Sequence, residues 1–337
     1  MITTDWKDYL EGSKELKPLS NSYKVQFILD ILEGCKYKCP GCFVKKRGNY
    51  DDLALTQAMQ AMLSCKEELF EIDDIVLGPT DFFGADNILD ILKDDRMKEL
   101  CSNVKGIQHN TSIDENIDDG FVGEVISFLE AHPEYSTLNY DVQIAVDLNS
   151  LLHDKKYQSL IDIRWNTFKD SSLKYEVSFL ANIDDTSISS EDVQGFVEKR
   201  WETVVEYAPS IMRSHNFTKV KEALESWKTY SSGYNLHSDL GHKTYNHITL
   251  NFNKNKIYLA PFIYEVAAVY SKEYEVPADA AKMIDKYNEI VREQYISSGP
   301  TCQKCPHLNE CVHRLIPYYT MNSLGEEDYC PLNLEFL

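Results

Sequence analysis

Three cysteines directly after an apolar stretch constrain the fold of this chain more than any other sequence feature. The stretch covers residues 27–32, has the length and composition of a buried strand, and is followed by Gly34. Cys35, Cys39 and Cys42 come next, with the spacing C-x3-C-x2-C. An odd number of thiols cannot pair evenly as disulfides, whereas three thiolates on one short loop can hold one small inorganic centre.

Cysteine thiolates are the usual ligands of iron–sulfur clusters. A cubane cluster contains four irons, so three cysteine ligands leave one iron with an open coordination position. An open position distinguishes a reactive metal site from a structural one. The spacing alone leaves two alternatives, a zinc knuckle and three buried free thiols.

The cysteine motif and the strand before it resemble the signature of the radical S-adenosylmethionine (radical SAM) enzymes. The resemblance implies that Cys35, Cys39 and Cys42 form the catalytic centre, with a [4Fe–4S] cluster whose open iron binds the amino and carboxylate groups of S-adenosylmethionine (SAM). It also implies reductive cleavage of SAM to methionine and a 5′-deoxyadenosyl radical, which abstracts a hydrogen from the substrate. The family often has an aromatic residue just before the third cysteine. Gly41 stands there, and Phe43 is our candidate for packing near the adenine.

Composition narrows the class of protein and of partner. The chain has 337 residues, enough for one large domain or for a large and a small one. No apolar stretch approaches the length of a membrane span, and the polar, acidic N-terminus is unlike a signal peptide, so we expect a cytoplasmic protein without a membrane partner. In that compartment, nine cysteines indicate metal or redox chemistry rather than a disulfide scaffold. A net charge of −20 disfavours nucleic acid as a partner.

Predicted strands and helices alternate over the first two thirds of the chain, which indicates an α/β fold of parallel βα units. We expect strands at residues 24–32, 73–77, 104–108, 141–146, 173–180 and 203–207. We expect helices at residues 56–70, 88–100, 116–131 and 155–168, and one that begins at 190. Six such units after a cysteine loop match the partial (β/α)6, TIM-like barrel of the radical SAM family, in which ligands lie at the C-terminal ends of the strands. We expect an N-terminal arm over 1–22, this barrel over 23–215, and a small α+β domain over 216–337.

The loops after the later strands resemble family motifs that contact SAM. Residues 78–81, Gly-Pro-Thr-Asp, stand where the family commonly has Gly-Gly-Glu-Pro. The resemblance implies a backbone contact from Gly78 to the methionyl amino group, with Thr80 in place of the glutamate and Asp81 as the candidate carboxylate. Further cofactor-binding candidates are Asn110, Ala145, Asn182 and Arg213, which end or follow the third, fourth, fifth and sixth strands. Candidates for substrate contacts are Asp81, Asp147, Tyr234 and Tyr245.

A second cysteine group lies near the C-terminus, after an expected helix at 217–232, a hairpin at 248–259 and a helix at 278–295. Its members are Cys302, Cys305, Cys311 and Cys330. On chemistry alone, four such thiolates suit either a structural zinc or a fully ligated [4Fe–4S] cluster.

The second group resembles the C-terminal half of the SPASM extension of radical SAM enzymes, which usually holds two auxiliary clusters. The four cysteines match the outer cluster. The family's inner cluster has a cysteine after a short hairpin, and Ala260 stands in its place, just as Leu315 stands where the family has a further cysteine. The resemblance therefore implies one auxiliary [4Fe–4S] cluster, with a structural or electron-relay role.

These features predict a radical SAM enzyme that holds two [4Fe–4S] clusters and receives electrons from a flavodoxin or ferredoxin. The SPASM resemblance points to a peptide substrate. Alternatives are a small metabolite, such as an amino sugar or amino acid derivative, and a non-catalytic iron–sulfur protein. Cys65 and Cys101 are expected to be buried and inert, and His237, His242 and His247 lack a metal-ligand spacing. The oligomeric state stays open.

Overall fold

The computed structural model describes residues 24–34, 52–68, 70–78, 80–113, 118–183, 188–209, 247–253, 256–260 and 274–286. The strands in these residues form one sheet in the order β6-β5-β4-β3-β2-β1-β7-β8-β9. The first six are β1 (Lys24–Asp30), β2 (Glu71–Gly78), β3 (Gly106–Ser112), β4 (Asn139–Val146), β5 (Lys174–Ile183) and β6 (Val205–Pro209). The last three are β7 (His247–Asn253), β8 (Lys256–Ala260) and β9 (Tyr274–Val276).

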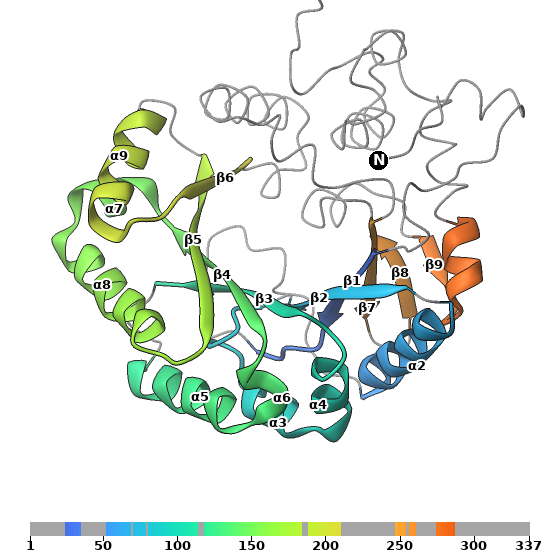
Figure 1. The fold of residues 1–337 in the computed structure, drawn as a ribbon. Coiled ribbons are helices and arrows are strands. Elements are labelled where there is room, and N and C mark those ends of the chain that lie inside the picture. Colours follow the sequence, from blue (N-terminus) through green and yellow to red (C-terminus); the bar gives the residue numbers. More distant parts are fainter. Residues whose placement is uncertain are drawn as a thin grey trace, which may run out of the picture.

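Strands β1 to β5 each pair in parallel with the next strand of the chain. Parallel neighbours require crossover connections, and helices supply them. These are α2 (Leu53–Glu67), α3 (Ile88–Lys93), α4 (Asp95–Cys101), α5 (Asp119–Ala131), α6 (Pro133–Ser136), α7 (Leu148–His153), α8 (Lys155–Lys169) and α9 (Ser190–Trp201). In Figure 1 the strands follow a curved path and the helices lie along its outer side. The α/β class with parallel strands, predicted from the sequence, is confirmed.

The predicted single helix over 88–100 is wrong, because two helices meet at Asp94. The backbone of Asp94 is extended, with φ −65° and ψ 128°, and its side chain accepts a hydrogen bond from the amide of Arg96 at 2.8 Å. Asp94 therefore ends α3 and caps α4. Two short helices, α6 and α7, and strand β9 are absent from the sequence-based prediction. Pro133 stands in the first turn of α6, and Asp147 caps α7.

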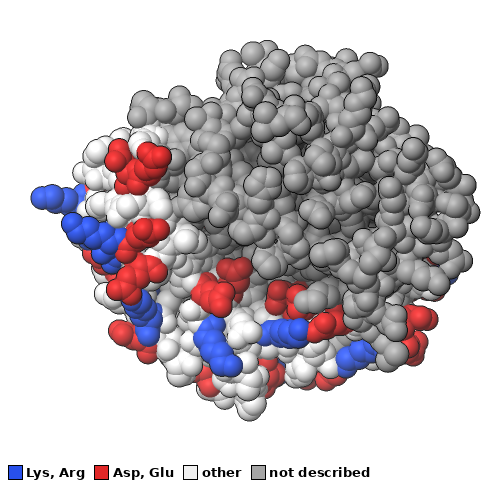
Figure 2. Space-filling view, turned by 45° about the horizontal axis from the view of Figure 1, so that its top comes forward, with Lys and Arg blue, Asp and Glu red and all other residues white. Residues whose placement is uncertain are grey.

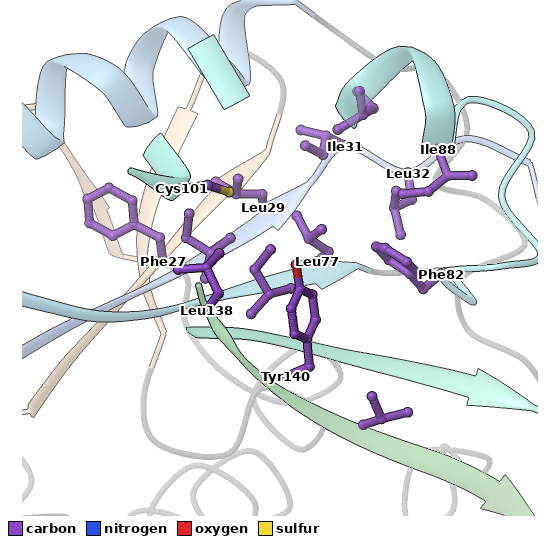
Figure 3. Close-up of a cluster of buried hydrophobic side chains, with 14 of the residues drawn as sticks. Phe27, Leu29, Ile31, Leu32, Leu77, Phe82, Ile88, Cys101, Leu138 and Tyr140 are labelled. Carbon is purple, nitrogen blue, oxygen red and sulfur yellow. The ribbon is translucent and has the colours of Figure 1, made fainter. Parts of the chain in front are cut away.

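Alternation along the strands separates a helix-facing side from an inner side. In β4 the even-numbered residues 140–146 are buried, and the odd-numbered residues between them are more exposed. The helix-facing side carries aromatic packing: the ring of Phe179 lies edge-on to Trp201 at 5.2 Å and to Trp165 at 6.0 Å. Figure 3 shows part of the same core around β1 and β2, including Leu29, Leu77 and Cys101.

The thiols of Cys65 and Cys101 are both buried in this core. Burial raises the pKa of Cys65 to about 12, and it raises the pKa of Cys101 as well. Both side chains are therefore protonated thiols that pack as small apolar groups, as the sequence predicts.

The expected C-terminal hairpin is present and continues the sheet. Strand β8 pairs antiparallel with β7, with Asn253 opposite Lys256. Strand β7 in turn pairs in parallel with β1, and the Phe27 and Phe252 rings lie 4.8 Å apart. Residues 280–286 are helical, and the amide of Ala280 donates to the Ser64 hydroxyl on α2 at 2.9 Å. The expected arm over 1–22, the helix at 217–232 and the end of the helix at 278–295 lie outside the described residues. The domain boundaries remain predictions.

No helix in the described part of the chain combines the length and the apolar character needed to cross a membrane.

Phe179 offers a test of the aromatic packing between β5 and the helices. The side chain is fully buried, so Phe179→Ala should lower the free energy of unfolding by about 3–5 kcal/mol through lost contacts and the cavity left behind. Urea unfolding followed by circular dichroism measures the loss. Leu63→Ala, at a side chain that is 55% exposed on α2, is the control and should change the free energy by less than about 0.5 kcal/mol. Equal effects of the two substitutions would contradict the assignment of Phe179 to the core.

Candidate functional site

The backbone that leads to Cys35 is held at the carboxyl edge of the sheet. The amides of Ile31 and Leu32 both donate to the carbonyl oxygen of Gly78, at 3.1 and 3.2 Å. Gly78 is the last residue of β2, so the chain leaving β1 is tied to the end of the neighbouring strand. In parallel α/β sheets this edge is where ligands bind.

Two residues before α3 hold the same segment from the other side. The Glu33 amide donates to Oδ1 of Asn87 at 2.7 Å, and Nδ2 of Asn87 donates to the carbonyl of Ile31 at 2.9 Å. The amide of Asp86 donates to the carbonyl of Glu33 at 2.9 Å. Asn87 is not recognisable as a site residue from the sequence, because an asparagine before an apolar helical stretch signals only a helix start.

Gly34 makes the last described turn before the cysteines. Its φ is +66°, a conformation that residues with a Cβ adopt rarely. A Cβ on Gly34 would also lie 2.1 Å from Oδ2 of Asp86. The Asp86 side chain is exposed and can turn away, so the positive φ is the stronger reason for glycine here.

Gly78 leaves space beside its own backbone. The residue is buried, yet a Cβ added to it would meet no atom of the described residues within 4 Å. A ligand can therefore approach the backbone of Gly78 closely, which fits the SAM contact that the sequence predicts there. The three cysteines are a suitable donor set for a cluster with one open iron, and they follow directly on the segment held at Gly78. The thiols themselves lie outside the described residues.

Asp81, the candidate carboxylate, points into the protein. Its Oδ1 accepts from the Gly84 amide at 2.8 Å and from the Thr111 hydroxyl at 3.4 Å, and its Oδ2 accepts from the Ser112 amide. Burial raises the pKa of Asp81 to about 6, although the hydrogen bonds from Gly84 and Ser112 and the charge of Arg164 act in the opposite direction. The contacts described for this carboxylate join the ends of β2 and β3, and its role towards a cofactor stays a prediction.

Arg164 on α8 supplies the positive charge that acts on Asp81. Only 3% of its surface is exposed. Nη2 donates to Oδ1 of Asp119 at 3.0 Å, Nη1 donates to the Thr111 hydroxyl at 3.4 Å, and the guanidinium lies 5.8 Å from the Phe83 ring centre. The group links two helices to the end of β3, and none of its members except Asp81 was singled out from the sequence.

His109 lies next to this group, in an aromatic pocket. Its ring stacks on Phe82 at 4.1 Å and lies edge-on to Phe83 at 5.4 Å. Within the described part of the chain, neither ring nitrogen has a hydrogen bond of ordinary geometry, and the buried hydroxyl of Thr80 likewise has no partner there. Burial lowers the pKa of His109 to about 3, so the imidazole is neutral.

The other predicted site residues are only partly described. Asn110 is exposed on β3, and its carbonyl accepts from the Phe82 amide at 3.0 Å. Ala145 on β4 pairs with Ser112 and is partly exposed, and Asn182 on β5 pairs with Ala208. Oδ1 of Asp147 accepts from the Ser150 amide at 2.7 Å. The predicted residues outside the described part are Cys35, Cys39, Cys42, Phe43, Arg213, Tyr234, Tyr245, Cys302, Cys305, Cys311 and Cys330.

Among the described residues, no group of three His, Cys, Asp or Glu side chains is arranged to hold a metal ion. Figure 2 shows one face of the molecule, on whose described part basic side chains stand beside acidic ones. Two ion pairs of the described surface are Arg200 with Asp162 and Lys98 with Asp95, at 2.6 and 3.0 Å. Exposed pairs of this kind contribute little to stability.

Comparison with known proteins gives a remote structural likeness. No protein-family model matches the chain, and no curated protein matches it. A solved structure of a histidine-tagged protein, described as "anSMEcpe with bound AdoMet", is similar, with a TM-score of 0.47 and 12% sequence identity, over 90% of this chain and 91% of that one. A likeness this remote carries no argument about the activity of this chain.

Asp81 and His109 predict opposite effects of pH on stability. The folded pKa of Asp81, about 6, lies above its ordinary value of 3.8, so the native state binds the extra proton and gains stability as the pH falls between them. The folded pKa of His109, about 3, lies below its ordinary value of 6.5, so the unfolded state binds the extra proton and stability is lost as the pH falls below 6.5. The two contributions oppose each other across roughly pH 4–6.

Single substitutions should expose each contribution. Across about pH 4–6, Asp81→Asn should lose more stability on acidification than the wild type, and His109→Phe should lose less, each by about 1.4 kcal/mol per pH unit. Urea unfolding at several pH values measures the slopes. Asp90→Asn, which removes an exposed carboxyl on α3, is the control. If stability changed with pH in the same way in the wild type and all three variants, burial would not shift the pKa of Asp81 or His109 as described.

Proposed function

We propose that the chain is a radical SAM enzyme, which cleaves SAM reductively at a [4Fe–4S] cluster on Cys35, Cys39 and Cys42 and abstracts a hydrogen from its substrate. One observation carries the proposal. The segment that leads directly to the C-x3-C-x2-C motif is held by hydrogen bonds at the carboxyl edge of a parallel α/β sheet. The motif on its own also suits a zinc knuckle, whereas a motif placed at this edge has room for a ligand of its open iron.

A cluster held there would supply the electron that converts SAM to methionine and a 5′-deoxyadenosyl radical. The residues of the chain would bind and orient SAM. The space beside Gly78 allows close approach of the methionyl group to the backbone. Asn110, exposed on β3, is available to the cofactor, and Ala145 offers no hydroxyl in the place where the family often has one. Phe43, Thr80, Asp81, Asn182 and Arg213 complete the proposed SAM site.

The proposed architecture follows the family. We infer a partial (β/α)6 barrel from β1 to β6, with one auxiliary [4Fe–4S] cluster on the second cysteine group in a SPASM-like domain. Ala260 ends β8, opposite Thr249, and offers no thiol for an inner cluster. With four protein ligands, the auxiliary cluster has no open iron, which supports a role in electron relay or in structure.

A peptide is the proposed substrate, on the strength of the SPASM resemblance, with a flavodoxin or ferredoxin as reductant in the cytoplasm. The lack of a thiol at Ala260 favours a second candidate, a small metabolite such as an amino sugar or amino acid derivative. Incubation of the reduced enzyme and SAM with deuterated candidates of both classes separates them, because deuterium would appear in 5′-deoxyadenosine only with the true substrate.

The two proposed clusters can be tested separately by replacing the cysteines of each group. After anaerobic reconstitution, the wild type should hold roughly eight irons per chain and release 5′-deoxyadenosine from SAM with dithionite. Replacing Cys35, Cys39 and Cys42 by alanine should remove about half of the iron and all cleavage. Replacing Cys302 and Cys305 by alanine should remove the other half and leave SAM binding at the first cluster.

Cys65→Ala is the matched control, because it removes a buried thiol that is no proposed ligand and should keep the full iron content. SAM cleavage by the triple variant, or none by the wild type with any reductant, would refute the radical enzyme. Zinc in place of half of the iron would remove the auxiliary [4Fe–4S] cluster from the proposal.

A further inference from the structure

Asn87 stands at the start of α3 but does not cap it. Asparagine is among the best N-cap residues, because its side-chain oxygen can accept from the free amides of the first turn. No side-chain cap bond is present at Asn87. At comparable positions Asp94, Asp147 and Asp154 all accept such a bond. The side chain of Asn87 is therefore used elsewhere.

The amide group of Asn87 bridges two backbone groups of the segment before Cys35. Oδ1 accepts from the amide of Glu33 at 2.7 Å, and Nδ2 donates to the carbonyl of Ile31 at 2.9 Å. The first bond needs an acceptor and the second a donor, so together they fix the orientation of the amide. A carboxylate of the same shape could make only the first bond.

Asn87 contributes the side-chain part of a larger arrangement. Gly78 and Asp86 hold the same segment through three backbone bonds, which side-chain substitutions leave in place. The side chains of Ile31, Leu32 and Ile88 lie in one buried cluster beneath it (Figure 3). Of these five hydrogen bonds, only the two made by Asn87 depend on a side chain. A substitution at 87 therefore removes those two bonds and leaves the three backbone bonds in place.

We propose that Asn87 is a positioning residue for the first cluster, because it fixes the direction in which the chain passes from β1 through Gly34 to Cys35. The inference rests on the proposed function for what the cysteines hold. Residues that orient metal ligands without touching the metal commonly affect its affinity by about 10- to 100-fold. Asn87 acts through the backbone of Ile31 and Glu33, shortly before the first cysteine in the sequence.

Asn87→Asp and Asn87→Ala separate positioning from helix initiation. Aspartate is as good an N-cap as asparagine, and its charge suits a helix N-terminus, so a residue needed only to start α3 would tolerate it. Aspartate nevertheless loses the bond to Ile31 and sets a carboxylate oxygen against that carbonyl. Alanine loses both bonds. We expect both variants to be impaired, which helix initiation alone does not predict.

The first measurement needs no cluster. Hydrogen–deuterium exchange of peptides covering residues 29–34, in the protein as purified, reports on the Glu33 amide that Asn87 protects. We expect exchange to be faster by about tenfold or more in Asn87→Ala, since the loss of one bond worth about 1.5 kcal/mol opens the amide by that factor. In Asn87→Asp, circular dichroism should confirm that the fold is kept.

The second measurement reads the cluster itself. In a background with Cys302→Ala and Cys305→Ala, iron reports on the first cluster alone. Both variants at 87 should lose iron to a chelator about tenfold faster than this background, and the change in their EPR spectrum on adding SAM should be weaker. Asp154→Ala is the matched control, because it also removes two hydrogen bonds from one side chain, to the amides of Lys156 and Tyr157, but at α8.

The outcomes distinguish two failures. Unchanged exchange at 29–34 and unchanged iron loss in both variants would overturn the role of Asn87, as would equal effects from Asp154→Ala. Faster exchange with unchanged iron loss would show that Asn87 orders the segment without positioning the cluster, which also overturns the proposal. A background protein that takes up no iron at Cys35, Cys39 and Cys42 would instead refute the proposed function.

Discussion

The carbonyl oxygen of Gly78 accepts two hydrogen bonds from successive amides, and the geometry of the candidate site depends on them. A carbonyl has two lone pairs, so one atom at the end of β2 can fix two peptide groups beyond the end of β1. The segment up to Gly34 is thereby placed before any cofactor binds. Because this anchoring is made by backbone groups at the end of a parallel sheet, it tolerates changes of side chain that a site built on side chains would not.

Behind this edge lies a polar centre made of the buried Asp81 and Arg164 and the partly exposed Asp119, with His109 beside it. Burying charges is costly unless they are paired, and here one guanidinium lies near two carboxyl groups. The neutral imidazole adds no charge. The opposed titrations of Asp81 and His109 keep the protonation of this centre from biasing stability in one direction as the pH changes.

The sequence predicted the parts of the fold that depend on local pattern. Apolar periodicity placed β1 to β6 and most of the helices between them, and the buried thiols of Cys65 and Cys101 followed from their apolar neighbours. Features that depend on contacts between distant segments could not be predicted from local pattern. The break at Asp94 depends on a capping bond that competes with helix continuation, and the choice of Asn87 between capping α3 and bridging to Glu33 is made only when β1 lies beside it. The inward orientation of Asp81 likewise depends on the Ser112 amide and the Thr111 hydroxyl that β3 brings to it.

The pairing of β1 with β7 has a consequence for how the chain reaches this structure. Lys24 pairs with His247, so the strand that precedes the cysteine motif gains its second neighbour only after most of the chain has been synthesised. Contacts so distant in sequence are slow to form, and until then one side of β1 is an open edge that can pair with other chains. The strand that leads to the proposed catalytic cysteines is thus completed late, and one of its edges stays open until synthesis has passed β6 and reached β7.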